Sequence, residues 1–514
     1  MDHSDIRSVG RELAEAAARF GDTPIVVHSA VRPAETTLGE LWDQSRRVAS
    51  RLRELGVTPG EVVAVQLPNW RECFVAHAAA WACGAVLLPI VPIYGPREVA
   101  LILRRSGARV FLAAGPGHGH DRAEVLAAAA GAPALEHRFA VGAGPGVPDF
   151  AELTTGTAST GEPYVPDHAG QACLLVYTSG TTAEPKGVLH SHESLLGELD
   201  AMRQMRGAGR EFRSLAAFPP GHVAGALGIL RMLGRGAPTV AMDRWSPAEA
   251  VELIVRHRIE STAGAPVHLA GLLDAAQERG ADLSSIVEYT TGAANVSADL
   301  IRRADRFGIK AFRCYGSTEH PTISSGVPQD PLDKRAETDG RPTPGTEILI
   351  VDDQGAPVPT GADGEILTRG PELFLGYTDS GRAGTAFTDG WFRTGDIGRL
   401  DAEGYLRITD RKKDIIVRGG ENISSKEIED VLLAHPGVAE AAAIGLPDER
   451  YGERVCAVVV PRNGHELDLP DVVAHFRASG LARQKTPEHL RVVAELPRTP
   501  SGKVQKPLLR SQFG

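Results

Sequence analysis

The sequence predicts an α/β protein with a large N-terminal domain and a small C-terminal domain. Its 514 residues exceed the roughly 250–300 residues at which a single hydrophobic core stops growing, so at least two domains are expected. Helix and strand signals alternate as far as about residue 314, and short strands with Asp/Gly turns occupy residues 343–409. A charged segment and a compact α+β pattern follow. We therefore expect domains at 1–410 and 411–514, with a β-rich subdomain at the end of the first.

The alternation begins with an amphipathic helix that Gly56 ends. Four apolar side chains fall on one face of this helix: Leu41, Val48, Leu52 and Leu55. Strand signals at 62–67, 86–91 and 108–114 are separated by helix signals at 73–83 and 96–106. Such alternation predicts a sheet with parallel strands covered by helices.

One uncharged stretch, from Cys73 to Pro96, is long enough to be weighed as a membrane span, since about 20 apolar residues can cross a bilayer. Polar and helix-breaking residues interrupt it, namely His77, Gly84, Pro89 and Pro92. We interpret it as a buried helix, a turn at Gly84 and a strand.

Composition favours a soluble cytoplasmic protein. Hydrophobic residues make up 42% and charged residues 23%, and the formal net charge is −10. A generic basic surface for nucleic acid is therefore not expected. The five cysteines are widely spaced, which favours reduced, buried thiols. The N-terminus has no apolar core like that of a signal peptide.

The most informative motif is LLVYTSGTTAEPKG at 174–187. An apolar strand enters a run of small hydroxyl residues, and a helix at about 192–205 follows. Gly180 permits close backbone approach, and the hydroxyl and N–H groups can hold phosphate oxygens, with Lys186 adding a cation. The run consists of Thr178, Ser179, Gly180, Thr181 and Thr182. Gly187 stands where a Walker A loop has Ser or Thr, which argues against a P-loop kinase or GTPase.

Four further segments carry candidate chemistry. FRCYGSTEH at 312–320 places Tyr315 where it could stack on a base and Glu319 where it could bind magnesium; a helix start is the alternative. WFRTGDIG at 391–398 places Asp396 after Gly395, in a tight turn where its carboxylate could accept ribose hydroxyls. The next segment, at 410–427, is DRKKDIIVRGGENISSKE, and it contains a capping box at Ser424 and Glu427. The last, at 497–506, is PRTPSGKVQK, in which Lys503 stands on a loop with Pro and Gly. HGHD at 118–121 is more simply a solvated loop than a metal site.

These five motifs, in this order, resemble the adenylate-forming superfamily of acyl-CoA synthetases, luciferases and adenylation domains, and the resemblance covers nearly the whole chain. It implies a mobile C-terminal domain and an active site between the domains, with ATP, Mg²⁺ and coenzyme A as cofactors or co-substrates. The implied phosphate loop is Thr178 to Thr182 with Lys186, and the implied adenine strip is Gly292, Ala293 and Ala294 with Tyr315 and Gly316. The resemblance places Thr318 near the α-phosphate, Glu319 on magnesium, Asp396 and Arg411 on ribose, Lys413 at the hinge, Gly420 at the pantetheine tunnel and Lys503 as the adenylation lysine.

Two positions depart from the family's common pattern. Ala183 stands where the phosphate loop commonly has Gly, and Lys413 stands where many relatives have Asp. Ala183 follows the hydroxyl run, so we expect the loop to tolerate it.

The implied activity is an ATP-dependent acid:CoA ligase that forms an acyl-adenylate and then a thioester. PPGHVAG at 219–225 matches the acyl-pocket region, so His222 and Gly292 are assigned to the pocket wall. Phe218–Gly228 contains no acidic residue, which disfavours an amino-acid substrate. A medium-chain or alicyclic carboxylic acid is expected.

Three alternatives remain open: a ligase that loads a carrier protein, a non-catalytic nucleotide- or acyl-binding regulator, and a phosphotransferase. Lys503, Glu319 and Asp396 are all present, which argues against the regulator, and a phosphotransferase would release ADP instead of AMP. No carrier domain and no peroxisomal signal follow Gly514, which favours free CoA as acceptor. No nucleic acid or membrane partner is expected, and a homodimer is left open.

Overall fold

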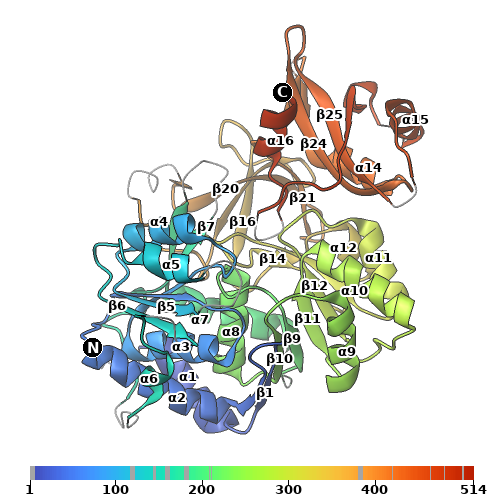
Figure 1. Ribbon diagram of the computed structural model, residues 1–514. Coiled ribbons are helices and arrows are strands. Elements are labelled where there is room, and N and C mark those ends of the chain that lie inside the picture. Colours follow the sequence, from blue (N-terminus) through green and yellow to red (C-terminus); the bar gives the residue numbers. More distant parts are fainter. Residues whose placement is uncertain are drawn as a thin grey trace.

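The computed structural model has a large N-terminal body of two sheets and a smaller C-terminal domain above it (Figure 1). It describes residues 6–115, 122–142, 146–156, 162–178, 185–207, 209, 211–379, 386–419, 421–462, 465–479, 481–499 and 503–514.

The first sheet has seven strands among the described residues, and its central strands run parallel, as the alternation predicts. Its spatial order is β18 (Gly376–Tyr377), β8 (Lys186–Ser191), β7 (Ala172–Thr178), β4 (Val86–Pro89), β3 (Val62–Gln66), β5 (Val110–Ala114) and β6 (His137–Val141). Strand β8 pairs antiparallel with β7, so the segment predicted as the phosphate loop joins two strands of a hairpin. The sequence prediction missed β8 and took the next element to be the helix that begins at His192.

The second sheet has nine strands among the described residues and is parallel from β13 to β1, with antiparallel pairs at both edges. Its order is β15 (Arg341–Pro342), β14 (Ser324–Ser325), β13 (Ala311–Tyr315), β12 (Glu288–Thr291), β11 (Ser261–Gly264), β9 (Ser214–Ala216), β10 (Thr239–Met242), β1 (Pro24–His28) and β2 (Ala34–Thr37).

Helices cover both sheets in the blue-to-yellow part of Figure 1. They are α1 (Val9–Phe20), α2 (Leu38–Glu54), α3 (Arg71–Cys83), α4 (Pro96–Ser106), α5 (Arg122–Ala129), α6 (Ala151–Thr154), α7 (His192–Arg206), α8 (Val223–Arg235), α9 (Pro247–His257), α10 (Pro266–Arg279), α11 (Ala298–Arg306) and α12 (Leu332–Glu337). The start of α2 is fixed by a capping box in which Thr37 and Glu40 each accept a backbone N–H of the other.

Helix α3 explains the uncharged stretch. Its residues from Glu72 to Cys83 are all buried, so it is a core helix that is apolar on every side. Gly84 ends it in the left-handed conformation with φ +85°, and β4 follows. Among the described residues, none of the helices has the length and apolar character that crossing a bilayer requires.

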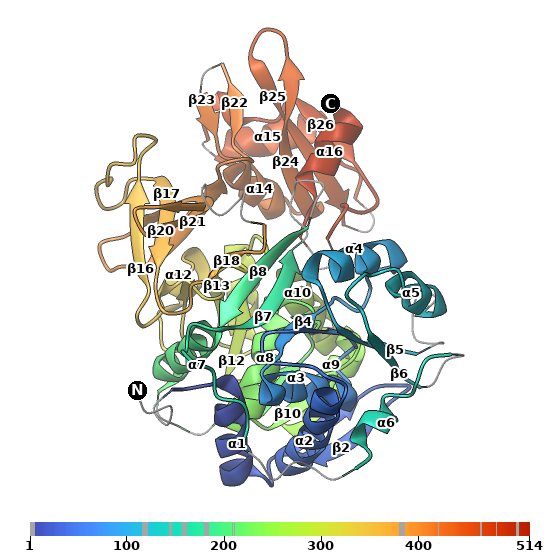
Figure 2. The ribbon, with the colours of Figure 1, turned by 90° about the vertical axis from the view of Figure 1, so that its left-hand side faces the viewer.

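The predicted β-rich subdomain is a third sheet, which Figure 2 shows to the side of the body. It contains β16 (Glu347–Val351), β17 (Gly364–Arg369), β20 (Trp391–Leu400), β19 (Phe387–Thr388) and β21 (Leu406–Arg411). The chain leaves this sheet at Arg411 and turns, since the N–H of Asp414 donates to the carbonyl of Arg411 at 2.8 Å. Placing the domain boundary at residues 410–411 stays a prediction.

The C-terminal domain is an α+β unit, as predicted. Its sheet contains β23 (Glu421–Ile423), β22 (Ile416–Arg418), β25 (Gly452–Pro461), β24 (Val438–Asp448) and β26 (His489–Val492), packed with α14 (Ser425–Ala434), α15 (Leu469–Ser479), a 3₁₀ turn (Arg483–Lys485) and α16 (Lys506–Phe513). Only half of the predicted capping box forms: the Ser424 hydroxyl accepts the Glu427 N–H, whereas the Glu427 carboxylate pairs with Lys485 at 2.6 Å.

Candidate active site

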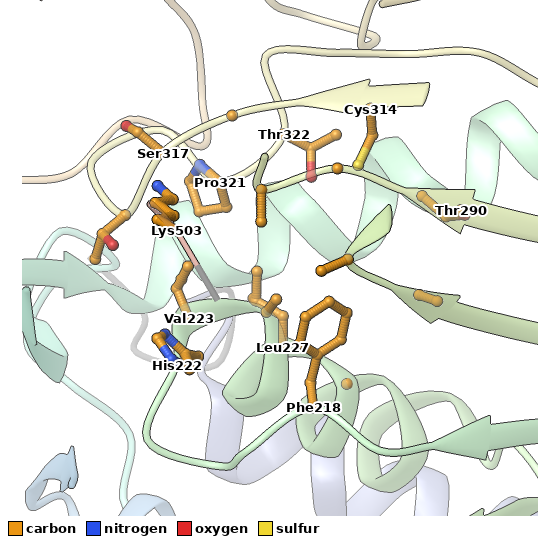
Figure 3. Close-up of a pocket in the computed structure, with 18 of the residues that line it drawn as sticks. Phe218, His222, Val223, Leu227, Thr290, Cys314, Ser317, Pro321, Thr322 and Lys503 are labelled. Atoms are coloured by element: carbon orange, nitrogen blue, oxygen red, sulfur yellow. The ribbon is translucent and has the colours of Figure 1, made fainter. Parts of the chain in front are cut away.

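A cavity of about 1890 Å³ lies where the two large sheets, the third sheet and the C-terminal domain meet. Figure 3 shows Lys503 at one side of it, near His222 and Val223. Residues from all five motifs line this cavity. The predicted site residues among them are Thr178, Lys186, His222, Gly292, Ala293, Gly316, Thr318, Glu319, Asp396, Arg411, Lys413 and Lys503.

Some predicted residues are placed elsewhere. Tyr315, which is half-buried, and Ala294, which is exposed, are not among the residues that line the cavity. Ser179, Gly180, Thr181, Thr182 and Gly420, together with Ala183 and the HGHD segment, lie outside the described residues.

Lys503 is held by a short backbone turn. The N–H of Thr499 donates to its carbonyl at 2.8 Å, and its own N–H donates to the Thr499 hydroxyl at 3.1 Å. Burial lowers the pKa of Lys503 to about 8, and the neighbouring Arg411 lowers it further, whereas Asp396 and Glu319 act in the opposite direction. The ammonium group therefore stands among the charged residues that the sequence motifs singled out.

Asp396 is a buried carboxylate with both oxygens engaged. One oxygen pairs with the Arg411 guanidinium at 2.8 Å, and the other accepts the Tyr315 hydroxyl at 2.7 Å. Burial and the Asp396 charge raise the pKa of Tyr315, so the phenol stays a donor. The tight turn predicted for Asp396 is wrong: it lies within β20, and Gly395 supplies a left-handed residue with φ +71° that bends the strand there.

Glu319 and Thr318 lie in a tight turn after β13, where a helix start had been the alternative. The Ser317 hydroxyl accepts the N–H groups of Glu319 and His320 at 3.2 and 3.3 Å. The carboxylate of Glu319 accepts the Tyr377 hydroxyl at 2.7 Å, and the Lys186 ammonium stands 5.3 Å from the centre of the Tyr377 ring. Through Tyr377, Glu319 in the turn is thus linked to Lys186 in the hairpin of β7 and β8.

His190 fixes the position of Thr318 and was missed from the sequence. Its Nε2 is 2.7 Å from the Thr318 carbonyl oxygen, so this nitrogen carries the proton, and its Nδ1 is 3.1 Å from the Ser194 hydroxyl. Burial lowers the pKa of His190 and keeps the ring neutral. The signal was its place in KGVLHS, three residues after the motif ends at Gly187.

Gly292 after β12 and Gly316 after β13 leave no room for a side chain. A Cβ on Gly292 would stand 2.6 Å from the Cys314 carbonyl oxygen, and one on Gly316 would stand 1.9 Å from that of Pro321. Ala293 has a left-handed backbone with φ +66°, which costs a non-glycine residue on the order of 1–2 kcal/mol. All three of these residues line the cavity.

The other half of the cavity is apolar. Phe218, Val223 and Leu227 line it in Figure 3, and one face of α8 forms a continuous wall from Val223 to Arg231. His222, the N-cap residue of α8, has an Nε2 that is buried without a partner among the described residues. Burial, with a contribution from Lys503, lowers the pKa of His222 to about 4, so it is a neutral part of the wall.

A buried carboxyl pair at the wall of the cavity was also missed. Thr322 donates to Glu198 at 2.9 Å, and Thr343 donates to Glu372 at 3.2 Å. Burial and the adjacent Glu198 raise the pKa of Glu372 far above its usual value, so Glu372 is protonated at neutral pH. Glu198 on α7 and Glu372 before β18 are 174 residues apart in sequence, and no local pattern signals their contact.

The residues present fit the groups that the motifs imply. In the part of the chain that the structure describes, no three His, Cys, Asp or Glu side chains converge on a metal position. Magnesium needs fewer protein ligands, since it is usually held by one or two carboxylates together with phosphate oxygens and water. Glu319 on the cavity wall supplies one such carboxylate.

The four cysteines Cys73, Cys83, Cys173 and Cys456 are buried thiols, as predicted, and Cys314 is half-buried on the cavity wall. Burial raises the pKa of Cys314 to about 12, which keeps it a thiol.

Comparison with known proteins agrees with this geometry. The family model of the AMP-binding enzyme matches residues 13–378, and that of the AMP-binding enzyme C-terminal domain matches residues 427–503. The fold and the cavity define an adenylate-forming enzyme. The chain belongs to the AMP-binding enzyme family, in its acyl-CoA ligase branch.

Three relatives illustrate the similarity. A medium-chain fatty-acid–CoA ligase of Escherichia coli (strain K12) is 35% identical over 93% of this chain and 86% of its own length. A 3-[(3aS,4S,7aS)-7a-methyl-1,5-dioxo-octahydro-1H-inden-4-yl]propanoyl:CoA ligase of Mycobacterium tuberculosis (strain ATCC 25618 / H37Rv) is 37% identical over 99% of both chains. The crystal structure of the anthranilate CoA ligase AuaEII in complex with anthranoyl-AMP has a TM-score of 0.89 to this chain, at 26% identity over 100% of this chain and 99% of that one.

These findings confirm the predicted family, fold class and enzyme class. The chain is an AMP-forming acyl-CoA synthetase, which uses ATP, a carboxylic acid and CoA. Its relatives differ in the acid they act on, so the family alone does not define the substrate.

Proposed function

We propose that this synthetase activates a medium-chain or alicyclic carboxylic acid and transfers its acyl group to free CoA. The observation that carries the proposal is the apolar wall of α8, which runs directly from the side of Lys503 into the cavity. A chain or ring of carbon atoms gains about 25 cal/mol per Å² on leaving water for such a wall. Two relatives named above act on a medium-chain fatty acid and on a fused-ring propanoic acid, and both kinds of acid support this choice.

In the first half-reaction, the substrate carboxylate attacks the α-phosphorus of ATP and pyrophosphate leaves. The carboxylate is already ionised at neutral pH, so no general base is needed. The main barrier is the meeting of two anions. Lys503 would supply a positive charge to the oxygens on which negative charge increases, and a preorganised cation in a closed site lowers such a barrier strongly.

The nucleotide would be held by the groups already paired around Asp396. Its two oxygens are engaged by Arg411 and Tyr315, and ribose hydroxyls would bind by joining or replacing these donors. Gly292 and Ala293 would border the adenine ring. Thr318 would approach the α-phosphate, and Lys186 with Thr178 would approach the outer phosphates.

Glu319 would hold magnesium, which when bound adds positive charge beside the phosphate oxygens. Tyr377 orients the Glu319 carboxylate through its 2.7 Å hydrogen bond and so limits the positions at which the metal ion can be held.

In the second half-reaction, the CoA thiol attacks the acyl-adenylate and AMP leaves. Lys503 is not needed in this step, and we propose that the C-terminal domain rotates about Lys413 to withdraw it. Lys413 lies in the turn between Arg411 and Asp414, at the point where the chain passes from β21 to the C-terminal sheet. Hinges are formed by a few such residues between packed units.

The test is an acid panel with product identification by mass spectrometry. The acids are butanoate, octanoate, palmitate, benzoate, cyclohexanecarboxylate and 3-cyclohexylpropanoate, each with Mg-ATP and with or without CoA. Formation of AMP and one medium-chain or alicyclic acyl-CoA is the expected result. AMP with a retained acyl-adenylate, and no acyl-CoA, would instead identify a carrier-protein acceptor.

Lys503→Ala serves as the internal control for this panel. It should lose adenylation and still convert supplied acyl-adenylate to acyl-CoA. A preference for palmitate or benzoate would refute the proposed substrate class.

A further inference from the structure

The apolar half of the cavity ends in a group of four charged side chains that the reaction described above does not use. They are Arg206 at the end of α7, Arg231 on α8, Glu288 at the start of β12 and Glu211 before β9, and all four line the cavity. We call them the distal charge cluster. Arg206 Nε is 3.1 Å from the Glu288 carboxylate, and Arg231 donates to one Glu211 oxygen from Nε and Nη2 at 2.9 and 2.7 Å.

Helix α8 and strand β12 each run from the region near the reacting groups to the distal charge cluster, so their lengths give its distance from those groups. His222 lies beside Lys503 at the start of α8 and precedes Arg231 by nine positions. Because a helix rises 1.5 Å per residue, Arg231 is about 13 Å from His222 along the helix axis. On β12, Glu288 precedes Gly292 by four positions, which is again about 13 Å at 3.3 Å per residue. The cluster therefore lies at the far end of the acyl site from the reacting carboxylate.

Charged side chains this far inside the protein are energetically costly. Glu288 is only 1% exposed, and removing a charge from water costs several kcal/mol unless it is paired and fully hydrogen-bonded. An apolar acyl chain would bury the cluster completely and leave donors unpaired. The distal charge cluster is thus a poor end wall for a simple hydrocarbon.

The two guanidinium groups line the cavity and have more donors than their ion pairs use. An arginine has five N–H donors. Among the described residues, Arg206 has Glu288 as its one ion-pair partner and Arg231 has Glu211. Their side chains keep 25% and 18% of their exposure although they line an interior wall. The remaining Nη groups can therefore reach a ligand in the cavity.

The charge of the cluster selects an uncharged ligand atom. Each of the two cations already has a carboxylate partner, and Glu198 adds a further negative charge near Arg206. The close approach of Arg231 adds to burial in lowering the pKa of Arg206. A second carboxylate on the substrate would bring an unbalanced negative charge beside Glu211 and Glu288. A carbonyl oxygen accepts hydrogen bonds without adding a charge.

The wall of α8 next to the cluster has room for a ring. Gly228 lies one turn before Arg231 on the cavity face of α8, and a Cβ built on it would meet no atom within 4 Å. The open space beside Gly228 can therefore accommodate additional ligand atoms.

We propose that the distal charge cluster binds a ketone oxygen, so that the acid is a ring-containing oxo acid with its carbonyl at the end remote from the carboxylate. This inference rests on the proposed function and narrows its substrate class. Arg231 and Arg206 donate to the ketone oxygen, while Glu211 and Glu288 hold the two guanidinium groups in place.

The test compares three acids of equal ring size: 3-(4-oxocyclohexyl)propanoate, 3-cyclohexylpropanoate and 4-(2-carboxyethyl)cyclohexanecarboxylate. The readout is kcat/KM for acyl-CoA formation. The wild-type protein should prefer the ketone over the plain ring by roughly 10–100-fold, because the plain ring leaves buried donors unpaired. The dicarboxylate should be the poorest of the three.

Variants then show which residues cause the preference for the ketone over the plain ring. Arg231→Met should reduce the ratio of ketone to plain ring to within about threefold of unity. Because Arg206 cannot be removed without leaving Glu288 buried and unpaired, the second variant is the double substitution Arg206→Gln with Glu288→Gln, which should also lower the ratio. Arg279→Met, which breaks an exposed pair with Glu252 outside the cavity, is the matched control and should keep the wild-type ratio.

The outcomes separate the two proposals. No acyl-CoA from any acid here or in the wider panel would refute the proposed function. Acyl-CoA formation with equal or higher kcat/KM for the plain ring, with the dicarboxylate as the best acid, or with an unchanged ratio in both cluster variants would refute the ketone site alone.

Discussion

The burial of Lys503 predicts an alkaline limit to the first half-reaction. Its pKa is lowered to about 8 from the usual 10.5. The cationic form, which the proposed role requires, is therefore lost as pH rises through 8: about nine-tenths is protonated at pH 7, half at pH 8 and one-tenth at pH 9. A lysine with the usual pKa would remain almost fully protonated over the same range. We expect kcat/KM for ATP to fall about tenfold between pH 7 and pH 9, since this constant reports groups in the free enzyme.

The assay is pyrophosphate release in the absence of CoA, measured at constant ionic strength from pH 6 to 9.5. Lys503→Arg is the control, because an arginine stays charged throughout this range. Its rate should be lower and its alkaline limb absent. Thioester formation from supplied acyl-adenylate should show the opposite trend and rise with pH as the CoA thiol ionises. A wild-type profile that is flat to pH 9.5, or an identical fall in Lys503→Arg, would refute the reasoning.

Three further predictions concern the hinge, the acyl wall and the buried carboxyl pair. Lys413→Pro should retain adenylation and lose thioester formation, whereas Lys413→Ala tests the side chain alone; equal loss of both half-reactions in the proline variant would contradict the hinge. Gly228→Leu should lower kcat/KM for ring acids by roughly tenfold or more and leave kcat/KM for butanoate unchanged. Circular dichroism should show a helix that is no less stable. An equal loss for butanoate would contradict the assignment of this part of α8 to the acyl site. Glu372 has a folded pKa raised above its usual 4.5, so its contribution to stability is full below pH 4.5 and declines as pH rises. Glu372→Gln should remove this decline and raise Tm at pH 8, and a lower Tm at that pH would contradict a protonated Glu372.

The order of elements could be predicted because local patterns determine it. Helix α3 followed from an apolar run with Gly84 at its end, and the helix at 96–106 was predicted with the bounds that α4 has. The five motifs also indicated which residues share one cavity, because each combines polar or glycine residues with the end of a strand or a loop. Strand β8 was missed because Lys186–Ser191 is short and follows a polar run, so its pairing with β7 has little local signal.

The contents of the acyl site could not be predicted in the same way. Arg206, Glu211, Arg231 and Glu288 come from four separate segments and look like ordinary surface charges in the sequence. Their position inside the cavity depends on how α7, α8 and β12 pack against one another. The Glu198–Glu372 pair likewise depends on contact between distant segments.

The way the C-terminal domain is attached has a consequence for how readily it can turn. Each of the hydrophobic clusters formed by the described residues lies wholly before Arg411 or wholly after it. Polar contacts link the two sides: Ser425 donates to Asp410 at 2.6 Å, Ser424 to the Thr409 carbonyl at 2.7 Å, and Asn295 to Asp430 at 2.9 Å.

Water can replace such hydrogen bonds at a net cost of about 1 kcal/mol each. Among the residues that form these clusters, no hydrophobic cluster has to be separated when the C-terminal domain turns. Reversing a two-state population from 1:99 to 99:1 takes a difference of about 5.5 kcal/mol in ligand binding free energy between the two states. For the rotation proposed above, we therefore expect bound substrates to shift which orientation predominates.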